Sequence, residues 1–396
     1  MQVRTGHEKL LDEQRELIRG RRVGLIVNPT SVGPDLIHLA TRIAHSDDVR
    51  LAALFGPEHG ILGTAQDMIS VPESSDTLLG VPVFSLYGDT LESLRPDPDQ
   101  FQGLDVLVFD IQDIGTRYYT YAYTLMLAME VAAEAGVHVV VLDRPNPIGG
   151  AQVEGNVVHP GWDSFVGMHP LANRHGMTLG ELAQLFRSER AIDVELTVVT
   201  MDGWSREMLF NETGLPWVMP SPNMPTPDTA LVYPGMCLVE GTAMSEGRGT
   251  TRPFEIAGAP WLNGETLADA LMREGLPGVR VRALGFEPTF QKHAGAFCGG
   301  VQLHVTDPRT YDSMRTGVAF IRHCHALGGA DFDWRREVYE YVDDRLAIDL
   351  LFGDPLLRET LEAGATTEDL MNAMEPDRQE FLARRSEFLL YDRESR

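Results

Sequence analysis

Residues 49–60 read VRLAALFGPEHG, an apolar run that is followed at once by a glycine, a proline, a carboxylate and an imidazole. A short, continuous apolar run bounded by Gly and Pro is typical of a strand covered on both faces. Such strands form parallel sheets, which bind ligands just beyond the carboxyl ends of the strands. The stretch therefore predicts an α/β fold and a functional position around Glu58.

Further apolar runs of the same kind precede and follow this one. They alternate with helical patterns at residues 35–46 and 119–136, the signature of βα units around a parallel sheet. The runs are RVGLIV (22–27), VPVFSLY (81–87), DVLVFD (105–110) and VHVVVLD (137–143), with VELTVVT (194–200) as a sixth. We expect a Rossmann-like parallel sheet.

The chain changes character between residues 203 and 262, which are rich in Pro and Gly. The Trp, Met and Tyr content of this region predicts a functional loop system rather than a flexible linker. Beyond it follow a helical pattern at 266–274, two strand patterns (279–286 and 300–306) and several helices. We predict a Rossmann-like catalytic domain at residues 1–262 and a smaller auxiliary α+β domain at 263–396 that closes the cleft.

The composition limits the possible partners. The 396 residues include 58 acids and 33 bases, a net charge of −25, which argues against nucleic acid and anionic membranes as partners. The three cysteines lack the CxxC spacing, and no H-E-x-x-H occurs, so we expect neither a metal nor a cofactor. No apolar stretch is long enough for a membrane span, and no signal peptide is visible. We therefore expect a cytoplasmic protein, or a secreted one if a signal peptide was removed from the sequence. Nothing indicates an oligomeric state.

Polar residues follow four of the predicted strands. No G-x-G-x-x-G follows the first strand and no P-loop occurs, which disfavours a nucleotide-dependent enzyme. One polar strand end is ordinary, but four at one sheet edge indicate a site. The residues are Asn28, Glu58, His59, Asp110, Gln112, Asp113, Arg117, Asp143, Arg144 and Asn146.

Each of these residues also has a structural interpretation. Glu58 fits a turn carboxylate bonded to backbone N–H groups about as well as a reactive acid, and His59 is more often structural. Of the four tyrosines at residues 118–123, most belong to a core, whereas one or two, Tyr118 among them, would suit stacking on a sugar. Asp143 precedes RPNP and equally fits a stiff turn.

Three later motifs carry further candidates. The loop SEGRGT (245–250) lies near Glu240 and would hold an anion through Arg248 and backbone N–H groups, although an ordinary Gly-rich loop is the alternative. His175, in RHG (174–176), fits a helix entry before the capping box of Thr178 and Glu181. Lys292 is one of only two lysines, which favours a position that needs a point charge.

The order and number of these motifs resemble the NamZ-type exo-β-N-acetylmuramidases, a glycoside hydrolase family long described as a domain of unknown function. The resemblance rests on GLIVNPTSV (24–32), FGPEHG (55–60), DIQDIGTRYYTY (110–121), DRPNPIGG (143–150), RHGMTLGELA (174–183), SPNMPTPDTALVYPG (221–235), EGTAMSEGRGTTRPFE (240–255) and PTFQKHAGAFCGGVQLHVTD (288–307). It implies release of N-acetylmuramic acid from the non-reducing end of muropeptides or short glycans, in cell-wall turnover or recycling. Two features depart from the family: Ala243 stands where we expect Asn, and no secretion signal is visible.

The resemblance places the family's glutamate, proposed as catalytic, on Glu58. Glycoside hydrolysis needs two carboxyl groups, and we expect Glu58 as the general acid, positioned by His59. The second carboxylate is Asp113, Asp143, Glu240 or Glu246, with Glu246 preferred. Arg117, Arg174, Arg248 and Lys292 are candidates for binding the lactyl carboxylate of muramic acid. The alternative is a non-catalytic muropeptide- or carbohydrate-binding protein that uses the same cleft without a reactive acid.

Overall fold

The larger of two sheets is parallel and has six strands. The computed structural model describes residues 2–65 and 79–391. The strands are β1 (Arg22–Val27), β2 (Arg50–Gly56), β3 (Val83–Ser85), β4 (Val106–Asp110), β5 (His138–Leu142) and β6 (Leu196–Val199). Their order is β3-β2-β1-β4-β5-β6, that of the Rossmann fold. All six predicted strands are present, although β3 is shorter than the run that predicted it.

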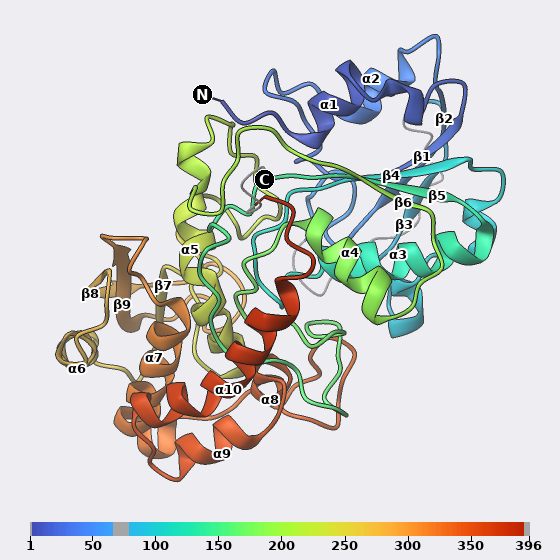
Figure 1. The fold of residues 1–396 in the computed structure, drawn as a ribbon. Coiled ribbons are helices and arrows are strands. Elements are labelled where there is room, and N and C mark those ends of the chain that lie inside the picture. Colours follow the sequence, from blue (N-terminus) through green and yellow to red (C-terminus); the bar gives the residue numbers. More distant parts are fainter. Residues whose placement is uncertain (1, 66–78, 392–396) are drawn as a thin grey trace.

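Helices cover both faces of this sheet. Figure 1 shows α1 (Gly6–Asp12) and α2 (Leu39–Ala44) above it, and α3 (Tyr121–Ala135) and α4 (Leu179–Glu189) below it. All residues of α3 from Tyr121 to Met129 are buried, because its apolar side chains point in every direction around the helix axis. The core on this side continues from the sheet through α3 into the second half of the chain.

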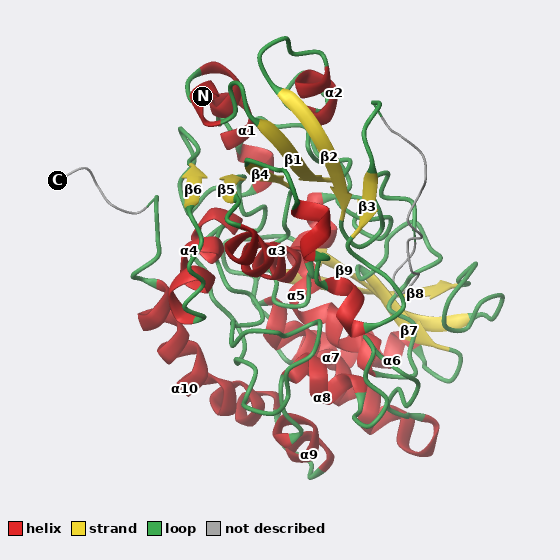
Figure 2. Cartoon of the chain, turned by 90° about the vertical axis from the view of Figure 1, so that its right-hand side faces the viewer, coloured by secondary structure: helices red, strands yellow, loops and turns green. Residues whose placement is uncertain are grey.

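The smaller sheet is antiparallel and lies with most of the remaining helices in another part of the molecule (Figure 2). Its strands, in the order β7-β9-β8, are β7 (Ile256–Ala259), β8 (Val279–Phe286) and β9 (Cys298–Val305). The helices are α5 (Pro227–Met236), α6 (Gly264–Arg273), α7 (Ser313–Gly328), α8 (Ala347–Phe352), α9 (Leu356–Glu362) and α10 (Thr367–Arg385). Short 3₁₀ helices span Arg15–Leu17, Leu91–Leu94, Pro98–Phe101, Phe210–Glu212, Cys237–Gly241 and Gly329–Asp331. The fold class is therefore as expected, while the domain boundary near residue 262 stays a prediction.

Helices α5 and α7 approach unusually closely. A Cβ atom on Gly235 would lie 1.8 Å from the backbone oxygen of Ser313, so only glycine permits this contact. The contact fixes α5 and the Pro-rich segment before it against the helices of the second half. That segment contributes to the cavity described below.

The switch point of the sheet, between β1 and β4, is filled by side chains. Asp110 at the end of β4 is fully buried and contacts His7 Nδ1 at 2.8 Å and Arg144 Nε at 2.6 Å. Burial opposes ionisation of this carboxyl, but Arg144 and His7 outweigh burial and hold its pKa at about 2. A neighbouring cavity of only about 20 Å³ remains. The sequence-predicted ligand residue Asp110 thus forms an internal ion pair.

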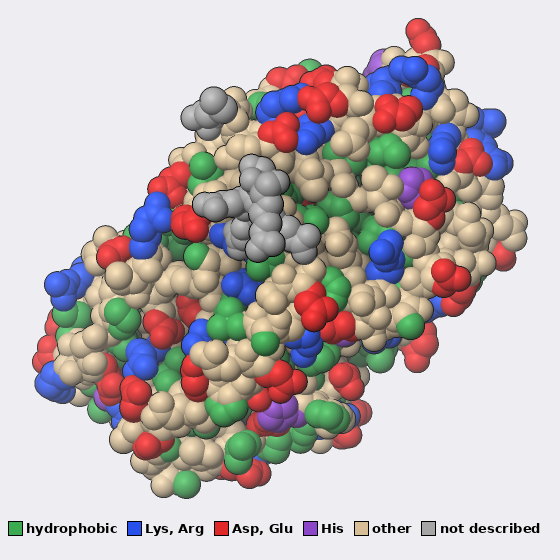
Figure 3. All heavy atoms as spheres, in the orientation of Figure 1, with side chains coloured by type: hydrophobic (Ala, Val, Ile, Leu, Met, Phe, Trp, Pro, Cys, Tyr) green, Lys and Arg blue, Asp and Glu red, His purple; other side chains and the backbone are tan. Residues whose placement is uncertain are grey.

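The surface carries charges of both signs. Figure 3 shows acidic and basic side chains intermingled on one face of the molecule rather than gathered by sign. Within residues 2–65 and 79–391, no helix is long and apolar enough to cross a bilayer. The same residues contain no group of three or more His, Cys, Asp or Glu side chains arranged to hold a metal ion.

Candidate active site

The FGPEHG turn folds tightly back on the end of β2. The backbone N–H of Gly60 donates to the oxygen of Pro57 over 2.9 Å, and a Cβ on Gly56 would lie 2.7 Å from the nitrogen of Ile61. His59 adopts a left-handed φ of 70°, which is rare for a residue other than glycine. Such strain costs roughly 1–3 kcal/mol and clusters at functional sites. The turn holds Glu58 at the sheet edge, where the residue is 7% exposed.

Glu58 takes a hydrogen bond from the next helix. Thr120 is the N-cap of α3, yet its hydroxyl makes no capping bond to the helix backbone. It instead donates to Glu58 Oε2 over 2.6 Å. This hydrogen bond orients the Glu58 carboxyl group beside the N-terminus of α3.

The tautomer of His59 follows from its partner. Nδ1 lies 2.8 Å from the backbone oxygen of Ala65, and a carbonyl can only accept, so Nδ1 carries the hydrogen. A neutral His59 therefore has its lone pair on Nε2. His59 lines the same cavity as Glu58, which makes it a potential acceptor there.

The cavity around Glu58 is narrow, and the described residues leave about 40 Å³ in it for solvent. Its walls come from the β2 turn, the start of α3, the Pro-rich segment and later loops. The lining residues are Glu58, His59, Tyr118, Tyr119, Thr120, Val166, Ser221, Asn223, Met224, Tyr233, Glu240, Arg248, Phe254, Tyr339 and Glu340. Burial raises the pKa of the lining phenols Tyr118, Tyr119, Tyr233 and Tyr339, so they stay protonated at neutral pH.

A charged cluster forms one wall of this cavity. Arg248 Nη2 donates to Glu240 Oε1 over 2.7 Å, and the Tyr339 hydroxyl donates to Glu240 Oε2 over 2.8 Å. Behind it, Glu246 lies 3.0 Å from Lys292 Nζ and 3.3 Å from Arg248 Nε. Burial opposes the charge of Glu246, but Lys292 and Arg248 outweigh burial and lower its pKa. Glu246 is thus an ionised partner of two cations and does not line the cavity.

The structure brings five of the sequence-predicted residues to the cavity: Glu58, His59, Tyr118, Glu240 and Arg248. The others named as candidates do not line it: Asn28, Asp110, Gln112, Asp113, Arg117, Asp143, Arg144, Asn146, Arg174, His175, Glu246 and Lys292. Of the four cations considered for a lactyl carboxylate, Arg248 alone lines the cavity. Their predicted roles in catalysis and binding remain predictions.

The two arginines outside the cavity have internal partners. Arg117 is fully buried and donates to the backbone oxygens of Asn156 (2.7 Å) and Leu351 (2.5 Å). Arg174, also fully buried, pairs with Glu154 over 2.5 Å. Both side chains therefore join segments that are distant in the sequence.

The remaining polar candidates also bond within the fold. The Asp143 side chain accepts from Thr178 and from Gly180 N at the start of α4. His175 Nε2 lies 3.6 Å from Asp113 Oδ2. Gln112 Nε2 donates to the oxygen of Pro145 over 2.7 Å, and Asn28 Nδ2 lies 3.5 Å from that of Pro220.

Some lining residues carried no individual prediction. Ser221 and Asn223 belong to the Pro-rich segment that predicted a functional loop, so the signal was present but not resolved to residues. Thr120 lies within the tyrosine-rich motif. Tyr339 and Glu340 come from a part of the sequence that offers no motif, and only the tertiary fold reveals them.

Comparison with known proteins identifies the same family along nearly the whole chain. The family models described as Exo-beta-N-acetylmuramidase NamZ match residues 23–228 (N-terminal) and 231–391 (C-terminal). A protein of Bacillus subtilis (strain 168), named peptidoglycan beta-N-acetylmuramidase NamZ, is 45% identical over 98% of this chain and 91% of its own length.

Two crystal structures of DUF1343 family proteins from Bacteroides fragilis NCTC 9343 share the fold. One is 36% identical with a TM-score of 0.88, and the other is 28% identical with a TM-score of 0.78; each comparison covers 99% of both chains. Sequence, fold and the arrangement of the FGPEHG turn lead to one conclusion: the chain belongs to the NamZ family of exo-β-N-acetylmuramidases.

Proposed function

We propose that this protein is a glycoside hydrolase that releases N-acetylmuramic acid from the non-reducing end of peptidoglycan fragments. The observation that carries the proposal is the buried Glu58 in a narrow cavity that Arg248 also lines. An exo-acting enzyme needs an enclosed site for one terminal sugar, and a muramic acid residue adds a carboxylate that a cation must meet. The family membership and the Bacillus relative support the same activity.

The chemistry requires two carboxyl groups. One protonates the leaving oxygen while the C1–O bond breaks, and the other supports attack at C1 from the opposite face. Glu58 provides one of these groups. Arg248 binds the lactyl carboxylate through its guanidinium fork, which is suited to carboxylates.

Substrate binding requires the lining side chains to adjust, because only about 40 Å³ of the cavity is open to solvent among the described residues. Movement of the lining loops upon binding would exclude water from the reacting bond and strengthen the electrostatic interactions around it.

The test uses the p-nitrophenyl β-glycoside of N-acetylmuramic acid. We expect the wild-type protein to release p-nitrophenol and Glu58→Gln to lose at least about 100-fold in kcat. Wild-type turnover in that variant would refute the role of Glu58. Binding of the sugar by the wild type without turnover, measured by calorimetry, would instead identify a binding protein.

A second assay separates exo from endo cleavage. With short glycans that begin with muramic acid, we expect free N-acetylmuramic acid as the first product detected by mass spectrometry. Internal fragments at early times would contradict the exo mode.

A further inference from the structure

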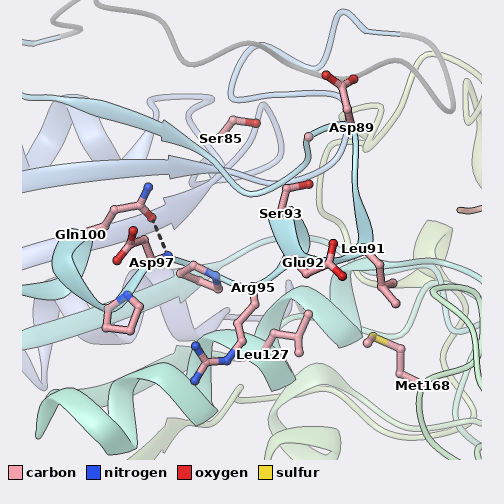
Figure 4. A pocket seen from close by; sticks show the side chains of 13 residues that line it. Ser85, Asp89, Leu91, Glu92, Ser93, Arg95, Asp97, Gln100, Leu127 and Met168 are labelled. Carbon is pink, nitrogen blue, oxygen red and sulfur yellow. Dashed lines mark hydrogen bonds between the residues drawn. The ribbon is translucent and has the colours of Figure 1, made fainter.

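The cavity around Glu58 adjoins an open groove, with which it shares a lining residue. The first part of the groove has a volume of about 640 Å³ and lies between Tyr87–Glu92 and Val338–Tyr341. A second part, of about 970 Å³, shares Gly88, Asp89, Leu91 and Glu92 with the first and continues along residues 93–100. Figure 4 shows the second part, with Leu91 and Met168 toward one end and Asp97 and Gln100 toward the other.

Glu340 lies where the cavity meets this groove. Among the described residues it is the only one that lines both the cavity around Glu58 and the first part of the groove. If the cavity holds the terminal sugar and the groove holds the rest of the glycan, the bond to be cleaved lies between them. The position of Glu340 therefore matches that of the leaving oxygen.

A strained hairpin turn holds Glu340 in this place. Tyr339 and Val342 exchange two backbone hydrogen bonds of 3.0 Å, which leaves Glu340 and Tyr341 as the two turn residues. Both have left-handed φ angles, 46° and 68°. Such a turn favours Asn and Gly, so a glutamate and a tyrosine are costly here.

Specific contacts maintain that conformation. The Tyr341 hydroxyl donates to the oxygen of Gly88 over 2.9 Å, on the opposite side of the groove. The hydroxyl of Tyr339 bonds to Glu240 in the cavity wall. These two bonds fix the hairpin to both the groove and the cavity.

Glu58 and Glu340 both lie near Tyr87. Burial raises the pKa of Tyr87, and the carboxyl groups of Glu58 and Glu340 lie near enough to raise it further. The same two carboxylates help to raise the pKa of Tyr341 to about 12, although burial contributes most. Both acids are therefore near the same pair of phenols.

The other nearby carboxylates are placed differently. Glu240 lies in the cavity wall and accepts hydrogen bonds from Arg248 and Tyr339. Glu246 pairs with Lys292 and Arg248 and lies outside the cavity lining. Glu58 itself lies inside the cavity and accepts the hydrogen bond from Thr120 at the N-terminus of α3.

We infer that Glu340 is the proton donor to the glycosidic oxygen and that Glu58 acts as the carboxylate on the side of the attacking group. This inference rests on the proposed function. It also changes the role of Glu58, which the sequence alone suggests is the general acid. In a single displacement, Glu340 gives its proton to the leaving oxygen, which keeps the electron pair of the broken C1–O bond. Water forms the new bond to C1 and gives its proton to Glu58. Proton exchange with solvent then restores both groups.

The test compares substrates that differ in their need for a proton. A sugar leaving group must be protonated, whereas 2,4-dinitrophenolate leaves without help. For Glu340→Gln, we expect kcat on a muramic acid–glucosamine disaccharide to fall by at least about 100-fold and kcat on the dinitrophenyl glycoside to stay within about tenfold of wild type. Glu58→Gln should lose activity on both substrates.

Glu337→Gln is the matched control, because Glu337 lies on the same segment with its side chain 80% exposed. It should behave as wild type on both substrates, and circular dichroism with thermal unfolding should show that all variants fold. Equal losses on both substrates for Glu340→Gln, or no loss on the disaccharide, would overturn the inference. Failure of the wild-type protein to cleave either substrate would instead refute the proposed function.

Discussion

Thr120 donates its hydroxyl hydrogen to Glu58 Oε2 over 2.6 Å instead of capping α3, the helix that it begins. A threonine at this position would ordinarily accept a hydrogen bond from the backbone of its own helix. The helix therefore forgoes a capping interaction, and the sheet edge gains a donor that orients a buried carboxylate. Departures of this kind from local rules are expected at functional sites.

Replacement of Thr120 tests this relationship. Thr120→Val preserves the shape but removes the donor, and a hydrogen bond to a charged group contributes about 1.5–3 kcal/mol. We expect kcat/KM to fall by about 10- to 100-fold, while the melting temperature changes little because no cap is lost. Thr120→Ser should retain most activity. A fully active valine variant would contradict an orienting role.

A substitution of His59 can separate its effect on activity from its effect on stability. Its φ of 70° is strained, and Asn adopts this conformation more readily. We expect His59→Asn to unfold at the same temperature as wild type or slightly higher, yet to lose at least about tenfold in kcat on the p-nitrophenyl substrate. Thermal unfolding and initial rates measure both effects. A lower melting temperature with unchanged kcat would make His59 a structural residue.

Arg248 is the cation that lines the cavity among those considered for the lactyl carboxylate. Arg248→Lys keeps the charge but loses the planar fork. We expect the inhibition constant of N-acetylmuramic acid to rise about tenfold and that of N-acetylglucosamine, which lacks the lactyl group, to stay unchanged. Arg252→Lys, at a side chain that is 43% exposed, is the control. Equal changes for both sugars would argue against lactyl recognition.

Local sequence patterns were sufficient to predict the parallel sheet and the position of Glu58 at its edge. The six strands are continuous apolar runs, and this signal depends only on neighbouring residues and on burial of both sheet faces. Glu58 could be predicted because a strand end and its turn are contiguous in the sequence. The Pro-rich segment could be recognised as functional, but its contact residues, Ser221 and Asn223, could not be distinguished from their neighbours.

The sequence does not show which charges face a cavity. Arg117 and Arg174 resemble anion-binding residues, yet their guanidinium groups bond to backbone oxygens and to Glu154 inside the fold. Glu340 carries no motif and reaches the cavity only because a hairpin of the second half packs beside Gly88. Both outcomes depend on contacts between residues far apart in the chain, which periodicity and spacing do not encode.

The buried pair of Asp110 and Arg144 predicts a stability effect that depends on pH. The folded-state pKa of Asp110, about 2, lies below its ordinary value of 3.8. Its ionised form therefore stabilises the fold above pH 3.8, and this contribution disappears as the pH falls toward 2. A shift of nearly two units corresponds to roughly 2–3 kcal/mol.

Asp110→Asn leaves the Arg144 charge buried without its partner, which should lower the free energy of unfolding by about 3–5 kcal/mol at neutral pH. Urea unfolding from pH 7 to pH 2 should show this difference shrinking below pH 4. Asp105→Asn is the control: the pKa of Asp105 is also about 2, but its ion pair with Arg22 is exposed and should contribute at most about 1 kcal/mol. If the two variants lose equal stability, burial of the Asp110 pair does not determine its effect, and the switch point of the sheet is not held together by this ion pair.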